Sequence, residues 1–286
     1  MKHLSLRINQ ATLSIEIPKE IENLVRDTVF SAIIRPDKSK SKSDYLIHIR
    51  DDRWELFRHR TRTHRNRRTE KILYALEWQV VNDLIRMSPN TLKFHAAALS
   101  KNGEGRLFIG GSGSGKTSLS IFLMKYGWNF LSDEFGWIAT DSLEMIPFPR
   151  NLIIKPHLKP YVNIPAELPS IPLYREDYSK YSANFLSPTL LGNIETEKCV
   201  PLKQIFFLSS YRTNTIKIER IAQNRAFIEL CNSLFNLRGS TRFLTDIVAM
   251  ILKQAPVFQM SLPNPLTFSM SESENLLKLL ERDGLS

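Results

Sequence analysis

Residues 110–117 read Gly-Gly-Ser-Gly-Ser-Gly-Lys-Thr, and this stretch decides which fold we expect. It fits the pattern G-x-x-x-x-G-K-[ST], in which glycines let backbone N–H groups turn inward around phosphate oxygens. An apolar strand pattern over 107–109 precedes the stretch, and an amphipathic helix pattern over 116–126 follows it. We name residues 110–117 the phosphate loop. The alternative is a Gly/Ser-rich loop that contains a lysine by chance.

The residue types in the phosphate loop predict a site for a nucleotide and Mg²⁺. The loop leads into a helix, whose free N–H groups and dipole favour an anion. Lys116 can reach the β- and γ-phosphates, and Thr117 offers a hydroxyl to Mg²⁺. The residues that we expect to bind the nucleotide are Gly110, Gly111, Ser112, Gly113, Ser114, Gly115, Lys116, Thr117 and Ser118.

Two acidic residues follow the phosphate loop at a chain distance that allows them to return to it. Asp133 lies 17 positions after Lys116, and Glu134 is next to it. The helix after the loop leads about 15 Å away from the phosphates. Gly127 then reverses the chain, and a strand over 128–133 leads back roughly 17–20 Å. Both carboxylates are therefore expected beside the loop, one to hold Mg²⁺ and one to accept a proton from an attacking hydroxyl. The alternative is that one of them only caps a turn.

Four segments together resemble the HPr kinase/phosphorylase-related serine kinases. They are residues 94–99 (Phe-His-Ala-Ala-Ala-Leu), the phosphate loop, residues 127–135 and residues 147–150 (Pro-Phe-Pro-Arg). The most similar members are bacterial HPr kinase-like proteins found beside peptide-modification or exopolysaccharide/exosortase genes, including the lasso-peptide kinases. The similarity is close over 92–156 and looser over 201–262. It implies the phosphoenolpyruvate (PEP) carboxykinase-like P-loop fold, an α/β core with a mixed sheet and flanking helices.

The resemblance also implies an activity, which is transfer of the γ-phosphate of ATP, with Mg²⁺, to a hydroxyl that is usually serine. Asp133 corresponds to the proposed general base and Glu134 to a second acidic residue close to the metal. His95, which alone would read as a core residue of an apolar strand, matches a His near the γ-phosphate. Arg150 and Lys155 fall in a segment that lies beside the active site in similar proteins. The catalytic candidates are Asp133, His95, Lys116 and Arg150, and the metal candidates are Thr117, Asp133 and Glu134.

One departure from the family limits what the resemblance implies. The carboxy-terminal signature by which true HPr kinases recognise their carrier protein and run the reverse phosphorolysis is not apparent. We therefore do not expect HPr as substrate, phosphorylase activity or a hexamer. The expected acceptor is a hydroxyl on a peptide, protein or small molecule, for example a precursor peptide. The alternatives are a nucleotide-binding regulator, an ATPase associated with nucleic acid or a protein partner, and a family member that binds without turnover.

Periodicity predicts a small N-terminal α+β domain over 1–90 and a catalytic domain over 91–286. In the first, strand patterns cover 4–8 and 13–17, helical patterns cover 18–30 and 70–87, and a hairpin joins 45–49 to 54–57. In the second, strands are expected at 91–100, 106–109, 128–132, 135–139, 145–148, 205–208, 215–218 and 256–262. Helices are expected at 116–126, 224–237, 240–253 and 271–282. The last helix carries a capping box at Ser271 and Glu274. Residues 155–198 are rich in proline and receive no assignment.

The charge is unevenly distributed along the chain. The net charge is +10, and the basic segment 58–71 holds seven basic residues and one acid, so it contributes +6 and leaves +4 elsewhere. This segment lacks the interleaved aromatic residues of a nucleic-acid stacking surface, which argues against nucleic acid. We expect it to dock an acidic partner, and the alternative is a solvated face.

The remaining composition predicts a cytoplasmic protein without a membrane span. The two cysteines, Cys199 and Cys231, show no metal or redox spacing. No apolar stretch reaches the ~20 residues that a spanning helix needs. The first residues alternate and do not form the apolar core of a signal peptide.

Overall fold

The computed structural model describes residues 1–37, 43–166, 168, 170–174, 180–209, 213–235 and 241–281. It divides into two compact units, each of them a mixture of helices and strands. The first unit contains Met1–Pro89 and Pro149–Leu190, and the second contains Asn90–Phe148 and Leu191–Ser286. One division therefore lies at Pro89, beside the expected boundary at 90. Residues 149–190, which we expected in the second domain, group with the first unit.

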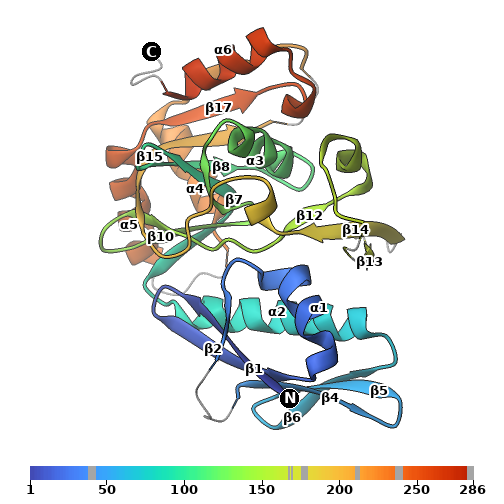
Figure 1. Ribbon diagram of the computed structural model, residues 1–286. Coiled ribbons are helices and arrows are strands. Elements are labelled where there is room, and N and C mark those ends of the chain that lie inside the picture. Colours follow the sequence, from blue (N-terminus) through green and yellow to red (C-terminus); the bar gives the residue numbers. More distant parts are fainter. Residues whose placement is uncertain are drawn as a thin grey trace. The chain divides into compact units, whose positions relative to one another are not determined.

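A mixed six-stranded sheet forms most of the first unit, in the order β3-β1-β2-β4-β5-β6 (Figure 1). Its strands are β1 (Lys2–Ile8), β2 (Ala11–Ile17), β3 (Ile34–Pro36), β4 (Tyr45–Arg50), β5 (Arg53–Arg58) and β6 (Thr61–Asn66). Alternating residues of β1 and β2 are buried, as the period-two pattern requires. Helix α2 (Thr69–Met87) packs against β2, β5 and β6. The strands expected at 4–8 and 13–17, the hairpin and the helix at 70–87 are confirmed.

Shorter elements complete the first unit. The single helical pattern over 18–30 forms three consecutive short turns, η1 (Lys19–Ile21), α1 (Glu22–Val25) and η2 (Arg26–Phe30), the last of which is π-helical. The unassigned segment 155–198 contributes two strands of a three-stranded antiparallel sheet, and the third strand lies just before it. The order of this sheet is β12-β14-β13, with β12 (Leu152–Ile154), β13 (Ser170–Tyr174) and β14 (Lys180–Leu186), and it is accompanied by η3 (Pro156–Tyr161) and η4 (Pro188–Leu190).

The second unit is built on an eight-stranded mixed sheet. The strand order is β11-β10-β7-β8-β15-β17-β16, with β9 paired to β7 and a further pairing between β11 and β15. The strands are β7 (Thr91–Lys101), β8 (Glu104–Ile109), β9 (Asn129–Ser132), β10 (Phe135–Ala139), β11 (Glu144–Ile146), β15 (Val200–Leu208), β16 (Lys217–Arg220) and β17 (Val257–Ser261). Because β8 runs parallel to β15 and β15 runs parallel to β17, the central strands end at the same edge.

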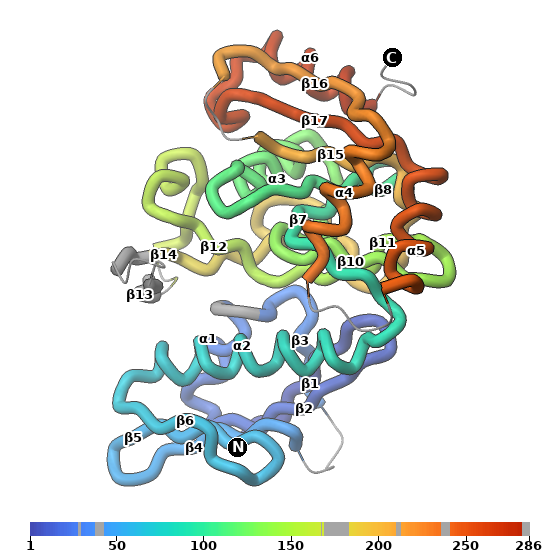
Figure 2. Tube along the Cα trace, turned by 180° about the vertical axis from the view of Figure 1, so that it is seen from behind, coloured from blue at the N-terminus to red at the C-terminus, as the bar shows by residue number. Residues whose placement is uncertain are grey.

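Helices cover both faces of this sheet (Figures 1 and 2). They are α3 (Lys116–Lys125), α4 (Gln223–Ser233), α5 (Thr241–Gln254) and α6 (Met270–Glu281), with a short turn η5 (Pro265–Thr267). Helices α4 and α5 share one core cluster with Leu107, Ile205 and Val257. The alternate residues Phe108, Phe206 and Phe258 stack on one another, with ring centroids 5.2 and 5.4 Å apart. Because side chains alternate along a strand, this stack lies on the opposite face of the sheet.

The expected strands and helices of the second unit are present, with shifted ends. Strand β15 begins five residues before the expected start at 205, and the described part of α4 ends at Ser233. Residues 236 and 237, which we expected in that helix, lie outside the described residues. The capping box of α6 lies at Ser269 and Glu272, not at Ser271 and Glu274. Among the described residues, no helix is long and apolar enough to cross a membrane.

Candidate phosphate-binding site

The phosphate loop connects the end of β8 to the first residue of α3. Gly113 and Gly115 have φ values of +82° and +93°, in the region that favours glycine. A Cβ on Gly110 would lie 2.4 Å from Ser114 Oγ, so this position also requires glycine. The loop therefore depends on glycine for its conformation at three positions, which a chance Gly/Ser run would not require.

Lys116 lies across the loop that precedes it. Its Nζ donates hydrogen bonds to the carbonyl oxygens of Gly110 at 2.6 Å and Gly111 at 3.1 Å. The residue is only 7% exposed, although it carries a charge. These contacts hold the ammonium group beside the loop backbone, where an incoming phosphate could replace carbonyl oxygens as its partner.

One buried hydroxyl of the loop has no partner in the described part of the chain. Ser114 Oγ is inaccessible to solvent and makes no hydrogen bond there. An unsatisfied buried hydroxyl costs about 1–3 kcal/mol, so such groups are rare and call for an explanation. A bound phosphate oxygen would accept a hydrogen bond from this hydroxyl, which fits the anion expected in this loop.

The hydroxyl of Thr117 meets the first of the two acidic residues. Thr117 Oγ1 donates a hydrogen bond to Asp133 Oδ2 at 3.2 Å, and Asp133 is 5% exposed. Thr117 is the second residue of α3, and Asp133 directly follows β9. The strand after α3 therefore returns to the loop, as the lengths of helix and strand predict.

The second acidic residue pairs with His95. Glu134 Oε1 lies 3.5 Å from His95 Nε2, and their side chains are 37% and 46% exposed. The two residues meet because His95 is opposite Phe135 in the pairing of β7 with β10. His95 is therefore a half-exposed neighbour of Glu134 and not a core residue of its strand.

Ser132 stabilises the turn that presents both carboxylates, and sequence reasoning missed it. Its Oγ accepts hydrogen bonds from the backbone N–H of Phe135 at 3.0 Å and of Glu134 at 3.4 Å. Ser132 thus performs the turn-capping role that we had considered for one of the acids. The available signal was a serine two residues before Glu134 at a strand end, where a hydroxyl often bonds to the backbone.

Arg150 and Lys155 belong to the first unit, whereas the other site candidates belong to the second. Arg150 Nη2 forms an ion pair with Glu77 Oε1 at 3.1 Å, and their side chains are 8% and 9% exposed. Glu77 lies on α2, and sequence reasoning did not identify it as a partner. The structure therefore gives Arg150 a buried partner within the first unit.

The described residues contain no group of three or more His, Cys, Asp or Glu side chains that could hold a metal ion. A magnesium ion beside a phosphate loop needs fewer protein ligands, because nucleotide phosphates and waters fill most of its coordination shell. Thr117 and Asp133, with Glu134 next in the chain, have the oxygen donors that Mg²⁺ prefers. The residues present therefore fit the metal.

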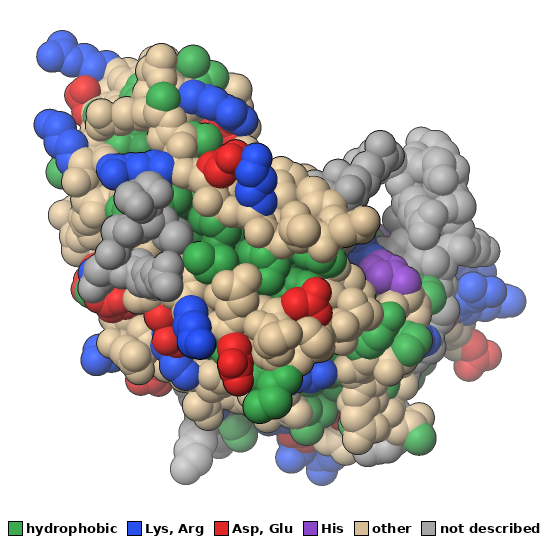
Figure 3. Space-filling model, turned by 90° about the horizontal axis from the view of Figure 1, so that it is seen from above, with side chains coloured by type: hydrophobic (Ala, Val, Ile, Leu, Met, Phe, Trp, Pro, Cys, Tyr) green, Lys and Arg blue, Asp and Glu red, His purple; other side chains and the backbone are tan. Residues whose placement is uncertain are grey.

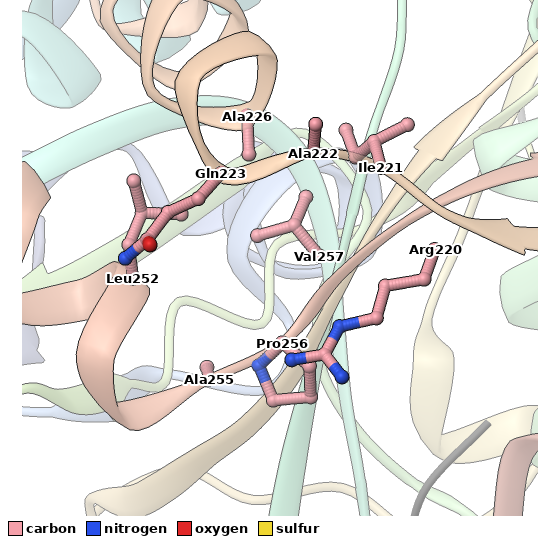
Figure 4. Close-up of a pocket in the computed structure, with 9 residues that line it drawn as sticks. All are labelled: Arg220, Ile221, Ala222, Gln223, Ala226, Leu252, Ala255, Pro256 and Val257. Carbon is pink, nitrogen blue, oxygen red and sulfur yellow. The ribbon is translucent and has the colours of Figure 1, made fainter. Parts of the chain in front are cut away.

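One face of the surface and one cavity among the described residues can be compared with the phosphate loop. On the face seen in Figure 3, Lys and Arg side chains are scattered among Asp and Glu side chains. A cavity of about 380 Å³ in the second unit is lined by residues 220–223, 226, 252 and 255–257 (Figure 4). None of these belongs to the phosphate loop.

The comparisons with known proteins leave the family open. No model of a known protein family matches the chain, and no curated protein matches it significantly. The resemblance to HPr kinase-like proteins therefore stays a prediction, and the geometry of the phosphate loop carries the functional argument.

Proposed function

We propose that the protein is an ATP- and Mg²⁺-dependent kinase with a PEP carboxykinase-like P-loop core. It transfers the γ-phosphate to a hydroxyl, usually serine, of a peptide, protein or small-molecule acceptor. The observation that carries this proposal is the hydrogen bond between Thr117 Oγ1 and Asp133 Oδ2. It joins a helix-start hydroxyl to a strand-end carboxylate, which is the pair of oxygen donors that holds Mg²⁺ in phosphate-loop enzymes.

The loop binds the nucleotide in this proposal. Its backbone N–H groups and the start of α3 face the phosphates, and Ser114 Oγ donates to a phosphate oxygen. Lys116 Nζ moves from the carbonyls of Gly110 and Gly111 to the β- and γ-phosphates. Mg²⁺, held by Thr117 and Asp133, would neutralise phosphate charge. These groups favour the transfer because they are positioned before the charge redistributes.

The two carboxylates differ in how easily the metal and an acceptor hydroxyl can reach them. Asp133 is 5% exposed and bonded to Thr117, which favours the metal side. The Glu134 side chain is 37% exposed beside His95, so an acceptor hydroxyl can reach it more easily. We therefore assign proton acceptance to this acidic pair, with Glu134 the more accessible member and His95 able to take part in the proton transfer.

A transfer assay with labelled ATP tests the proposal. The assay needs a hydroxyl acceptor, and candidates include short serine peptides and the protein itself. The Asp133→Asn variant should lower transfer by about 10²–10⁴-fold, because it removes a carboxylate from the metal and proton positions. Glu134→Gln should lower the transfer rate without changing its Mg²⁺ dependence.

The exposed residue Asp141 offers a matched control for these variants. It is a carboxylate of the same unit on the turn after β10, and Asp141→Asn should leave transfer unchanged. Transfer by Asp133→Asn at the wild-type rate would contradict the role of Asp133 in holding the metal and accepting the proton. Nucleotide binding without transfer to any acceptor would favour the alternative, a regulator that binds nucleotide.

A further inference from the structure

The basic segment 58–71 is less charged in three dimensions than its composition suggests. Arg58 is bonded through two nitrogens to Asp83 on α2. Arg62 and Arg65 reach Glu55, which is 1% exposed, at 2.8 and 3.1 Å. Carboxylates of the first unit therefore form ion pairs with three of the seven cations. The pKa of Glu55 is lowered, chiefly because its carboxylate accepts a hydrogen bond from His48 and also pairs with these arginines.

Three arginines of the segment remain available to a partner. Arg60, Arg67 and Arg68 are exposed, and no carboxylate of the described residues lies within 4.0 Å of them. Arg60 lies in the turn before β6, and Arg67 and Arg68 follow the strand. The available cations therefore flank both ends of one strand, which spans roughly 20 Å at ~3.3 Å per residue.

Strand β6 is the edge of the six-stranded sheet, and all six of its residues are exposed. Within the described ranges, only β5 pairs with it. The turn of His59 and Arg60 has φ values of 46° and 71°, typical of a two-residue hairpin loop whose flanking pair exchanges both hydrogen bonds. That pair is Arg58 and Thr61, and the next pair is Phe57 and Arg62, so alternation directs the backbone N–H and C=O of Arg62 away from β5. The register then shifts by one residue, because Leu56 pairs with His64, so the edge contains a β-bulge after Arg62.

We propose that the outer edge of β6 binds an extended acidic peptide segment, which adds to the sheet as a further strand. The peptide backbone pairs with the free edge, and its carboxylates meet Arg60 at one end and Arg67 and Arg68 at the other. The proposal goes beyond the kinase proposal, because the binding requires no nucleotide. If the protein is a kinase, this edge selects acceptors that carry an acidic segment.

Two other occupants fit the edge less well. Pairing of β6 with β6 of a second copy would place six arginines in proximity, and such like-charge contacts are a common means of preventing edge association. A nucleic acid would use the arginines but not the backbone edge, and it would stack best on Phe, Tyr or Trp residues, which β6 does not contain. An acidic peptide strand uses both the arginines and the free backbone edge of β6.

The test measures binding of a fluorescent peptide of alternating Glu and Val, as long as β6, to the full chain at low salt. Fluorescence anisotropy should show saturable binding without ATP. A peptide with Lys in place of Glu should not bind. The triple variant R60E/R67E/R68E should weaken binding about tenfold or more. The matched control R220E/R242E/K253E changes the same number of exposed cations in the second unit and should bind as the wild type does.

Two measurements separate strand addition from a simple charge contact. When a peptide pairs with an edge strand, only every second N–H group of the peptide bonds to that strand. N-methylation of the peptide residues whose N–H groups face β6 should therefore abolish binding. N-methylation of the residues in between should leave binding intact. Hydrogen exchange should slow at the Arg62 amide when the peptide binds. Equal effects of the two methylated peptides, unchanged exchange in residues 61–66, or no binding of the Glu peptide would overturn the proposal. Tighter binding of a single-stranded oligonucleotide, with the same loss in the triple variant, would also overturn it.

Discussion

Gly110 cannot accept a side chain in this loop, whereas its neighbour Gly111 can. A Cβ on Gly110 would lie 2.4 Å from Ser114 Oγ, 2.9 Å from Ser114 Cβ and 3.2 Å from Leu208 Cβ. A Cβ on Gly111 would meet no atom within 4 Å, and the φ of Gly111 lies outside the left-handed region. Adjacent glycines of one motif thus serve different purposes, the first providing packing space and the second an unobstructed backbone.

The pair of glycines supplies a matched experiment at this scale. Gly110→Ala should lower the free energy of unfolding by about 1–3 kcal/mol, because the new methyl group forces Ser114 and Leu208 to move. It should also weaken ATP binding. Gly111→Ala should leave the unfolding free energy nearly unchanged. Chemical denaturation followed by tryptophan fluorescence measures both variants, and equal losses would contradict the packing argument.

At the scale of elements, the start of α6 shows why capping positions are hard to place from sequence. Glu272 Oε2 accepts hydrogen bonds from the N–H and hydroxyl of Ser269 at 2.8 and 2.7 Å, and Glu272 N–H donates to Ser269 Oγ at 3.3 Å. The pKa of Glu272 is lowered, chiefly by the hydroxyl of Ser269. The pattern Ser-x-x-Glu does not occur at Ser271 alone, because Ser269 with Glu272 satisfies it two residues earlier.

Substitution of the two serines distinguishes these caps. Ser269→Ala should lower the free energy of unfolding by about 0.5–2 kcal/mol, because the N–H of Glu272 loses its acceptor. Ser271→Ala should change it much less. Urea denaturation of the two variants measures the difference. A larger loss of unfolding free energy in Ser271→Ala than in Ser269→Ala would contradict the cap at Ser269 and support the one expected at Ser271.

Local patterns predicted more of the elements than of the site's details. Alternation and helical spacing located β1, β2, α2, α3 and the strands around the phosphate loop. They did not reveal that the basic segment forms an exposed edge strand, because its charges hide the period-two pattern that apolar residues would show. The chain lengths before Asp133 placed the carboxylates, whereas Ser132 and the Glu77–Arg150 pair depend on contacts that sequence spacing does not encode.

At the scale of the whole molecule, the 39 Lys and Arg residues outnumber the 29 Asp and Glu residues and serve different purposes. Within the first unit, some cations form ion pairs with Asp83, Glu55 and Glu77. Arg60, Arg67 and Arg68 remain at the ends of β6. The phosphate loop in the second unit needs only a few local cations for a small anionic ligand. The paired cations cancel against these carboxylates, whereas the sheet edge and the ligand site each use a few of the excess cations. The basic composition therefore does not require a nucleic-acid partner.

The central claim is that residues 110–117 bind the phosphates of ATP with Mg²⁺. Isothermal titration calorimetry of Mg-ATP into the full chain tests it most directly, with Lys116→Ala and the exposed-lysine variant Lys253→Ala as a matched pair. We predict saturable binding by the wild type and by Lys253→Ala, and affinity at least about tenfold lower for Lys116→Ala, because an ammonium group in contact with phosphate is removed. Equal affinities of the two variants, or no binding by the wild type, would contradict the claim.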